Sequence, residues 1–451
     1  MISIVREMLK KMIEGFKLID TEKELNISIN EWQKIDPDSE TRLKNFRFKQ
    51  SSSDQLISQL STVGYIDLLE LPSGLTIKTY HYVGRIEIEN LRISIHPKIS
   101  GLPLLNLLRY AYKLRKLDLF HSLSYGTEKS NFLDLLIYQL ILEVNELIHR
   151  GLLRNYVKVD ESLQSPRGKI QFSDIAKKGG INEPYLLCNT FLRIEDNFLN
   201  QAVLAGLNFA TRLTSDIELK SSLRRTAKIL NQKVRDIPLS QKLINSAQIS
   251  INRLTVSYQP SITLIKKLYE SVGPSFLQNQ VQIKIPGFLF DMNLFFQELI
   301  GRFLRENLVD HTLREQYQLK RMLSYNPKHN PQFKKSYSPR PDFAILDGKK
   351  VVVLLDTKYR DVWEMDLPAD MLYQLSFYAI SQGLSGQATI IYPTMNEIAS
   401  EEWIDISHPI SQDHMATVKL RPINLFQLEK IIYQESDKQK KSFAHYIAFG
   451  K

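Results

Sequence analysis

The segment 340–360 constrains the fold of this chain more than any other part of the sequence. At its centre lies Asp347-Gly348, the kind of dipeptide that most strongly predicts a β-hairpin. An apolar run ends at Leu346, just before this dipeptide, and a second, fully apolar run spans 351–355. A five-residue run without polar residues is typical of a strand buried on both faces. The chain is therefore expected to contain a sheet with this hairpin at its centre.

Three charged residues lie at one end of this predicted hairpin. Asp356 and Lys358 are two residues apart, so they would project from the same face of one strand, and Asp342 would lie alongside. Two carboxylates provide oxygen ligands for Mg²⁺, or Mn²⁺ in its place, which polarises a phosphodiester and activates water. We therefore predict metal-dependent phosphodiester hydrolysis, with Asp342 and Asp356 as metal ligands and Lys358 assisting the water or the transition state. A salt-bridged surface strand is the alternative.

A helix is predicted to follow the hairpin. Asp370 is expected to cap it, and Gln374 and Tyr378, four residues apart, would share one of its faces. We expect both side chains to orient the site or to touch DNA, although Tyr378 could instead pack in the core. The apolar run 388–392 would then add a strand. This strand would complete an α-β-β-β-α-β core that begins with a helix capped by Asp291.

Positive charge gathers just before the hairpin. Residues 311–360 hold eleven Lys or Arg and four Asp or Glu, a net charge of 11 − 4 = +7. The stretch from 321 to 340 has five bases, no acid, three prolines and interleaved aromatic side chains, which is typical of an extended loop that contacts phosphates and stacks on bases. A solvated loop is the alternative. The predicted DNA-binding residues are Arg321, Lys328, Lys334, Lys335 and Arg340.

Length and composition limit the remaining possibilities. A chain of 451 residues is expected to form two to three domains, and its formal charge of +10 suggests a polyanionic partner. The only cysteine, Cys188, excludes an intrachain disulfide and a cysteine-based zinc site, which favours a cytoplasmic protein. No membrane segment is predicted, and no GxxxxGK[ST] phosphate loop occurs, so any nucleotide hydrolysis would belong to a partner.

The pattern along the chain predicts a multidomain α+β protein. Residues 1–60 resemble an N-terminal appendage with a linker, and 61–100 contain short β-rich runs separated by turn residues. Residues 101–280 show mostly helical periodicity. Residues 281–451 contain the predicted hairpin and are expected to form an α/β nuclease core with a mixed central sheet.

Two motifs in this last region resemble those of known nucleases. Pro341-Asp342, followed by Asp356-Thr-Lys358, resembles the PD-(D/E)xK nuclease superfamily, and Gln374 with Tyr378 resembles the QxxxY arrangement of RecB-like nucleases. Further fragments occur in the order seen in McrC-type proteins, the nuclease subunits of modification-dependent (type IV, McrBC-like) restriction systems. These fragments are Gly64-Tyr-Ile, Ile95-His-Pro-Lys-Ile99, residues 104–112, Arg167-Gly-Lys-Ile170 and Asp291-Met-Asn.

The resemblance implies an endonuclease subunit that cleaves double-stranded, modified DNA in an antiviral defence system. It also implies a ring-forming AAA+ partner of the McrB type, usually a GTPase, with 61–100 as the docking region. The first-helix carboxylate common in such nucleases would align near Gln297, with Glu298 beside it but opposite the apolar stripe. The alternatives are a RecB-like repair nuclease that needs no ring, and a non-catalytic adaptor that binds DNA or activates the ring.

Overall fold

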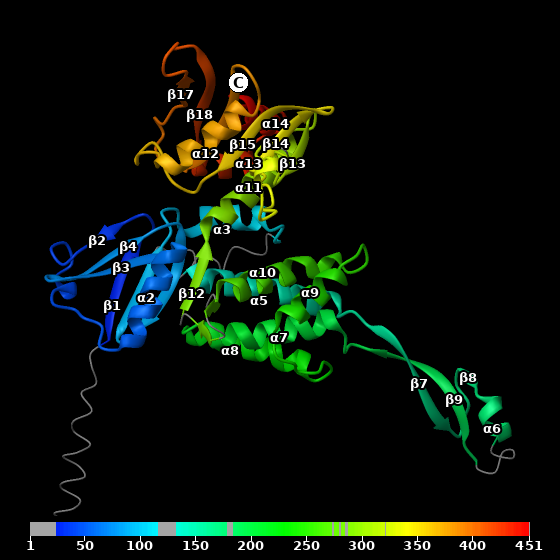
Figure 1. Ribbon diagram of the computed structural model, residues 1–451. Coiled ribbons are helices and arrows are strands. Elements are labelled where there is room, and N and C mark those ends of the chain that lie inside the picture. Colours follow the sequence, from blue (N-terminus) through cyan, green and yellow to red (C-terminus); the bar gives the residue numbers. More distant parts are fainter. Residues whose placement is uncertain are drawn as a thin grey trace, which may run out of the picture. The chain divides into compact units, whose positions relative to one another are not determined.

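The computed structural model describes residues 24–115, 132–177, 184–272, 275–278, 281–284, 287–320 and 322–450 (Figure 1). The chain divides into two compact units, one formed by 1–98 with 272–290 and the other by 99–271 with 291–451. Helices and several separate sheets occur together, so the predicted multidomain α+β class is confirmed. Among the described helices, none is long and apolar enough to cross a membrane.

The first unit is built from two small sheets and one helix. Ile27 and Ile29 alternate toward a core that also contains Leu60 and Ile66. The four-stranded sheet has the order β1 (Leu25–Asn30), β6 (Leu91–His96), β5 (Tyr82–Ile88) and β12 (Gly287–Asp291). The three-stranded sheet has the order β2 (Lys34–Ile35), β4 (Gly74–Thr79) and β3 (Ile66–Leu71), and β10 (Ser275–Gln278) pairs with β11 (Val281–Lys284).

The prediction of an appendage and linker over 1–60 is wrong for the part of it that the structure describes. Strand β1 pairs in parallel with β6, more than sixty positions along the chain, so its partner could not be found locally. The serines at 51–53, taken as linker, form the first turn of helix α2 (Ser51–Val63), and Ser53 donates a hydrogen bond to Glu89. Gly64 then ends this helix in the left-handed conformation at φ +78°, as C-terminal glycines commonly do.

The middle of the chain is mostly helical, as predicted, but it also contains a sheet. The helices are α3 (Gly101–Ala111), α5 (Phe132–Arg150), α6 (Phe172–Lys177), α7 (Phe198–Leu213), α8 (Ile217–Asn231), α9 (Gln241–Ile249) and α10 (Gln259–Ser271). Helices α5, α7, α8, α9 and α10 pack on one another, whereas α3 packs against two helices from later in the chain, α11 (Met292–Asn307) and α13 (Leu425–Gln434). The sheet has the order β7 (Asn155–Leu163), β9 (Leu186–Ile194) and β8 (Lys169–Ile170).

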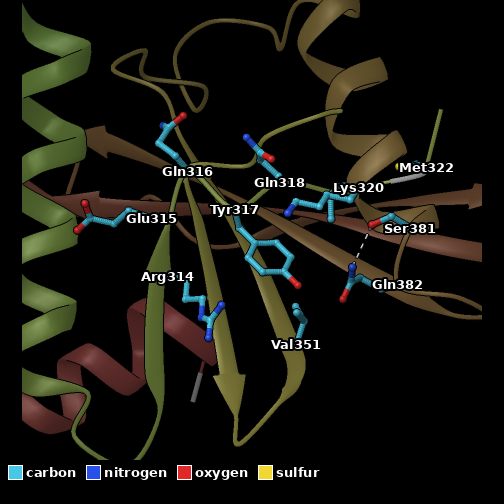
Figure 2. Close-up of a pocket in the computed structure, with 11 residues that line it drawn as sticks. Arg314, Glu315, Gln316, Tyr317, Gln318, Lys320, Met322, Val351, Ser381 and Gln382 are labelled. Carbon is cyan, nitrogen blue, oxygen red and sulfur yellow. Dashed lines mark hydrogen bonds between the residues drawn. The ribbon is translucent and has the colours of Figure 1, made fainter. Parts of the chain in front are cut away.

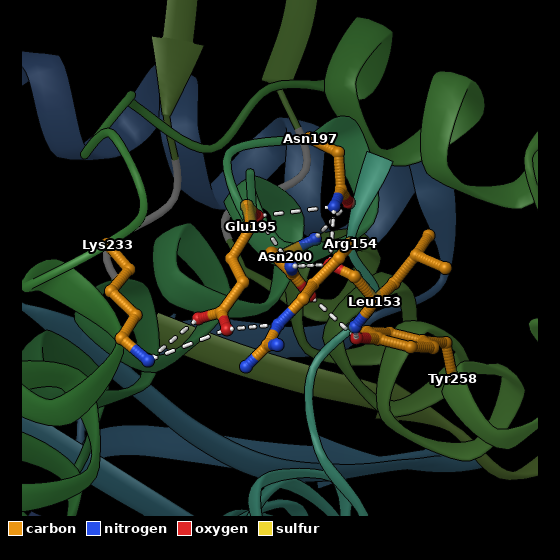
Figure 3. A network of polar contacts seen from close by, with 7 residues as sticks. All are labelled: Leu153, Arg154, Glu195, Asn197, Asn200, Lys233 and Tyr258. Atoms are coloured by element: carbon orange, nitrogen blue, oxygen red, sulfur yellow. Dashed lines mark hydrogen bonds and ion pairs between the residues drawn. The ribbon is translucent and has the colours of Figure 1, made fainter. Parts of the chain in front are cut away.

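A polar network holds the base of the β7–β9 ribbon, where the chain enters β7 and leaves β9, against the helices (Figure 3). The hydroxyl of Tyr258 donates to Asn200 at 2.7 Å and accepts from the backbone N–H of Leu153 at 2.8 Å. The amide of Asn200 in turn donates to the carbonyl oxygen of Glu195 at 2.6 Å, and the Glu195 carboxylate pairs with Arg154. The chain entering β7 is thereby joined to the chain leaving β9.

The predicted nuclease core has the expected α-β-β-β-α-β order. It runs through α11 (Met292–Asn307), β13 (Thr312–Glu315), β14 (Phe343–Asp347), β15 (Lys350–Thr357), α12 (Ala369–Ile380) and β16 (Gly386–Thr394). It continues through β17 (Glu402–Ser407), β18 (His414–Asn424), α13 (Leu425–Gln434) and α14 (Asp437–Phe449). The sheet order is β13-β14-β15-β16-β18-β17, with parallel pairs on both sides of β16, so the predicted mixed sheet is confirmed.

The predicted hairpin lies at the centre of this sheet. Strands β14 and β15 pair antiparallel with Asp347 opposite Lys350, and Gly348 has a left-handed φ of +57°. Helix α12 covers one face, where Leu375 packs on a cluster that includes Leu354 and Ile390. Helices α11 and α14 contact β15 as well. With apolar side chains on both its faces, β15 is a buried central strand, as its sequence indicates.

We predict that Tyr258→Phe destabilises the second unit by about 1–3 kcal/mol, because it leaves the Asn200 oxygen and the Leu153 N–H without a partner in a buried setting. Urea unfolding followed by circular dichroism measures the change. Tyr185→Phe is the control, since this exposed hydroxyl accepts only from Gln164, and we expect a change within about 0.5 kcal/mol. Equal effects of the two variants would contradict the role given to the network.

Candidate active site

Strand alternation places the three predicted site residues on one face of the sheet. Ala344 and Leu354 belong to the core beneath α12, and side chains two residues away along a strand share a face. Asp342 and Asp356 therefore lie on the α12 side. Phe343 pairs with Leu355, so the next pair along the ladder sets Asp342 opposite Asp356. The structure thus brings together the two carboxylates that the sequence predicts as metal ligands.

Asp356 is a buried carboxylate in the middle of the sheet. Its side chain is 2% exposed, and its Oδ2 atom lies 2.9 Å from Nζ of Lys358. The pKa of Asp356 is raised to about 6, chiefly by burial and also by the nearby charge of Asp342, although the ammonium of Lys358 opposes both effects. This carboxylate is therefore costly to ionise unless a cation lies beside it.

Asp342 is held by hydrogen bonds from two neighbouring segments. Its Oδ2 atom accepts from the backbone N–H of Thr357 at 2.8 Å and from the Thr357 hydroxyl at 2.6 Å. Its Oδ1 atom accepts from the side-chain amide of Gln316 at 3.2 Å. Gln316 has a left-handed φ of +49°, uncommon for a residue with a side chain, so the backbone is constrained where it meets Asp342. Thr357 and Gln316 thus fix the orientation of the Asp342 carboxylate.

Lys358 follows the last residue of β15 and remains attached to the sheet. Its backbone N–H donates to the carbonyl oxygen of Ile391 in the neighbouring strand β16 at 3.0 Å. Burial lowers the pKa of Lys358, but the negative charges of Asp356, Asp342 and Asp370 outweigh it and raise the pKa above its usual value. The side chain is therefore an ammonium ion, a donor of hydrogen bonds and positive charge, across the physiological pH range.

Gln374 and Tyr378 share a face of α12, as their spacing predicts. The side-chain amide of Gln374 donates to the Tyr378 hydroxyl at 2.7 Å. Tyr378 is buried in the core beneath α12, which was the alternative considered for it. Burial raises its pKa to about 12, and the charges of Asp356 and Asp342 also raise it, so the hydroxyl lies within electrostatic reach of the carboxylate pair. A role for either residue in binding or catalysis stays a prediction.

The predicted cap of this helix is wrong by two residues. Helix α12 begins at Ala369 with Pro368 in the N-cap position, so Asp370 lies inside the first turn. Proline fixes its own φ and is well suited to a helix start, which the sequence interpretation overlooked. In the first turn the Asp370 carboxylate still interacts favourably with the helix dipole.

Two positioning residues could not be predicted from the sequence. Asn293, which the sequence shows only as part of the Asp291-Met-Asn cap, accepts a hydrogen bond at its Oδ1 atom from the N–H of Tyr359 at 2.8 Å. Asp361 is buried and accepts from the Thr394 hydroxyl at 2.8 Å. These contacts hold the chain on both sides of Arg360, just after Lys358. Asp291 itself caps α11, as predicted, by accepting from the N–H of Leu294.

The first-helix carboxylate considered at Gln297 or Glu298 does not join this group. Glu298 pairs with Lys267 of α10, with the two charged atoms 2.9 Å apart. In the part of the chain that the structure describes, no hydrogen bond or ion pair links Gln297 or Glu298 to Asp342, Asp356 or Lys358. The carboxylate pair therefore comes from the β-hairpin alone.

The predicted DNA-binding loop is exposed and lacks regular structure apart from the short 3-10 helix η3 (Pro327–His329). Phe333 is 90% and Tyr337 71% exposed. Tyr337 acts electrostatically on Tyr378, so the end of this loop lies near the site. Arg321 lies outside the described residues, while Lys328, Lys334, Lys335 and Arg340 are all exposed. Their contact with DNA stays a prediction.

The carboxylate pair fits a hard divalent cation. Within the described ranges no group of three or more His, Cys, Asp or Glu side chains is arranged to hold a metal. Mg²⁺ does not need such a cage, because it keeps several waters and shares phosphate oxygens with its substrate. Among the described residues the buried Oδ2 atom of Asp356 accepts no hydrogen bond of good geometry, and it lies 2.9 Å from the ammonium of Lys358. An acceptor of this kind is available to a cation.

Comparison with known proteins gives the family. Residues 77–393 match the family described as "McrBC 5-methylcytosine restriction system component", and the chain belongs to it. A search of the curated proteins found no match. Among solved structures, the chain resembles one described as a refined half-complex from a tetradecameric assembly of Thermococcus gammatolerans McrB AAA+ hexamers with bound McrC. That match has a TM-score of 0.60 at 21% identity and covers 92% of this chain and 98% of the other.

A second structure, the Thermococcus gammatolerans McrBC complex, matches with a TM-score of 0.44 at 23% identity, over 64% of this chain and 89% of that one. The family match shows that this chain belongs to the McrBC family, as the sequence resemblance indicated, and the first of these structures shares its fold.

We predict a pH dependence of stability that originates at Asp356. Its pKa is about 6 in the folded chain and ordinarily 3.8, so the folded state binds more protons between these values. The contribution of Asp356 to metal-free stability should therefore fall as the pH rises through this interval, the opposite of the usual behaviour of carboxylates. Asp356→Asn should remove this contribution, so the stability difference between the wild type and Asp356→Asn should change with pH, as thermal unfolding at a series of pH values measures.

Asp347→Asn, at the exposed hairpin turn, is the control and should keep the pH dependence of the wild-type protein. A stability that rises between pH 4 and 6 equally in the wild type and Asp356→Asn would show that Asp356 titrates normally.

Proposed function

We propose that this chain is a Mg²⁺-dependent DNA endonuclease, the cleaving subunit of an McrBC-like restriction complex that acts when a ring-forming AAA+ NTPase activates it. The observation that carries the proposal is the buried Asp356 beside Lys358 and opposite Asp342 at the end of the central hairpin. Burying two carboxylates and an ammonium ion together at the centre of a sheet is costly unless a bound cation and a phosphate balance their charges.

Asp342 and Asp356 would hold the metal ion, with Mn²⁺ able to replace Mg²⁺. When bound, the ion polarises the phosphodiester and acidifies the attacking water. Lys358, charged at neutral pH, orients that water through its ammonium donors and stabilises the negative charge that develops on the phosphate oxygens. Thr357 and Gln316 keep the Asp342 carboxylate directed at the site. The exposed bases of the loop 322–340 would bind the DNA backbone.

The NTPase partner is proposed from two observations. The sequence has no phosphate-binding loop of its own, and the solved structure that this chain resembles holds AAA+ hexamers. We place docking in the β-rich region 61–100, which forms much of the first unit. The substrate would be double-stranded modified DNA, cleaved in the cytoplasm, and the base modification would be recognised by the partner, as the family resemblance implies.

Cleavage of methylated and unmethylated plasmid in Mg²⁺ tests this proposal. The chain is assayed alone and with its co-expressed AAA+ partner and nucleotide. We expect cleavage that requires the partner, and a loss of about a hundredfold or more in Asp356→Asn, because the variant lacks a metal ligand. Asp347→Asn, at the opposite end of the same hairpin, is the matched control and should cleave as the wild type does.

Two other outcomes would assign this chain a different function. Cleavage by the chain alone would favour a repair-type nuclease. Cleavage by the complex that Asp356→Asn leaves unchanged would place the active site outside this chain and make it an adaptor.

Metal binding can be measured without cleavage. Mg²⁺ should raise the melting temperature of the wild-type chain, since a ligand that binds only the folded state stabilises it. The increase should vanish in Asp356→Asn and shrink below about pH 6, where Asp356 takes up a proton. Differential scanning fluorimetry with and without Mg²⁺ provides the comparison, and an equal increase in Asp356→Asn would exclude Asp356 as a ligand.

A further inference from the structure

A polar hollow of about 890 Å³ opens beside the edge strand β13 (Figure 2). One side consists of β13 and the segment that continues it, from Arg314 to Lys320, and the opposite side includes Ser381 and Gln382 at the end of α12. Tyr317 packs against the core cluster beneath α12, which also contains Tyr378. The hollow therefore lies on the sheet face that carries the carboxylate pair.

The charges around the hollow are suited to phosphate. Arg314 and Lys320 are both exposed, and neither has a carboxylate partner among the residues that the structure describes. The one acidic residue of the lining, Glu315, points toward α11 and pairs with Arg305 (Figure 2). The cationic groups are thus left facing solvent, where a polyanion could neutralise them.

The uncharged groups are suited to a nucleobase. Gln318 and Gln382 present amides, which offer both a donor and an acceptor to the edge of a base. The ring of Tyr317 extends into the hollow between these side chains (Figure 2), and a tyrosine ring is a surface on which a base can stack. Cavities of this volume hold ligands of about the size of a nucleotide.

Gln316 connects the hollow to the carboxylate pair. It lines the hollow, and its side-chain amide also donates to Asp342 at 3.2 Å. A DNA strand whose scissile phosphate lay at Asp342 and Asp356 would therefore pass directly into this space.

Resting on the proposed function, we propose that the hollow binds a nucleotide of the cleaved DNA strand next to the scissile phosphate. Arg314 and Lys320 bind its flanking phosphates, Tyr317 stacks on its base, and the amides of Gln318 and Gln382 contact the base edge. The site would give the enzyme a local preference for the nucleotide beside the cut, independent of any partner that recognises the modified base.

A binding measurement tests the phosphate contacts. The full chain is titrated with a short fluorescein-labelled duplex, without divalent cation, at several salt concentrations. Each phosphate contact contributes about 0.9 to the slope of log affinity against log salt, so Arg314→Ala/Lys320→Ala should lower the slope by nearly two and the affinity by about tenfold. The control is Lys438→Ala/Lys441→Ala, which removes the same charge from exposed positions of α14.

A second measurement locates the DNA. The single native cysteine, Cys188, is buried, so Gln318→Cys introduces an accessible thiol that can carry an iron chelate. Hydroxyl radicals from this position should cut the DNA within a few nucleotides of the site that the enzyme itself cleaves, whereas the same chelate on Lys438→Cys should not.

The outcomes separate the two proposals. In one outcome, Asp356→Asn abolishes Mg²⁺-dependent cleavage, but the salt slope and the radical cuts do not differ from those of the α14 controls. This result would contradict DNA binding in the hollow and support the proposed nuclease function. In the opposite outcome, Arg314→Ala/Lys320→Ala lowers the salt slope and the chelate on Gln318→Cys cuts the DNA, but the complex does not cleave DNA in Mg²⁺. This result would support DNA binding in the hollow and contradict the proposed nuclease function.

Discussion

The ionised Asp356 in the centre of a sheet is the constraint on which the rest of the nuclease region depends. A carboxylate that is 2% exposed loses its hydration, and Lys358 at 2.9 Å restores only part of what water supplied. The neighbouring elements hold the charged residues in place despite this penalty. Strand β16 anchors the backbone of Lys358, α12 covers the face with apolar side chains, and Thr357 binds the second carboxylate. The arrangement is stable in the folded chain, yet additional positive charge beside Asp356 would lower its energy.

Asp356 differs from a second buried aspartate of this region in how its charge is compensated. The buried Asp361 accepts hydrogen bonds from Thr394 and from the backbone N–H of Trp363, so its charge is solvated by the protein. Asp356 lies against Lys358, and burial raises its pKa to about 6. A cation beside Asp356 would therefore favour its ionised form.

The parts of this site that could be predicted from the sequence are those whose partners lie close along the chain. Asp347-Gly348 specifies a hairpin, and the hairpin alone sets Asp342 opposite Asp356. Gln316 and Asn293 could not be found in this way. Asn293 meets Tyr359 across 66 positions, and Gln316 meets Asp342 only because β13 is added to the sheet edge and its chain turns through a left-handed residue. The prediction for the N-terminal part of the first unit was wrong for the same reason, since β1 pairs with the distant β6.

The site as it stands also limits what an activating partner can contribute. Asp342, Asp356 and Lys358 already occupy their positions within a single chain, held by hydrogen bonds from β15, β16 and the segment after β13. On the proposed function, a ring that stimulates cleavage would find these three residues already in place. We infer that its contribution would then be to bring DNA to the basic loop and the carboxylate pair, or to hold two such sites on opposite strands. Activation would in that case be delivery of substrate to a preformed centre.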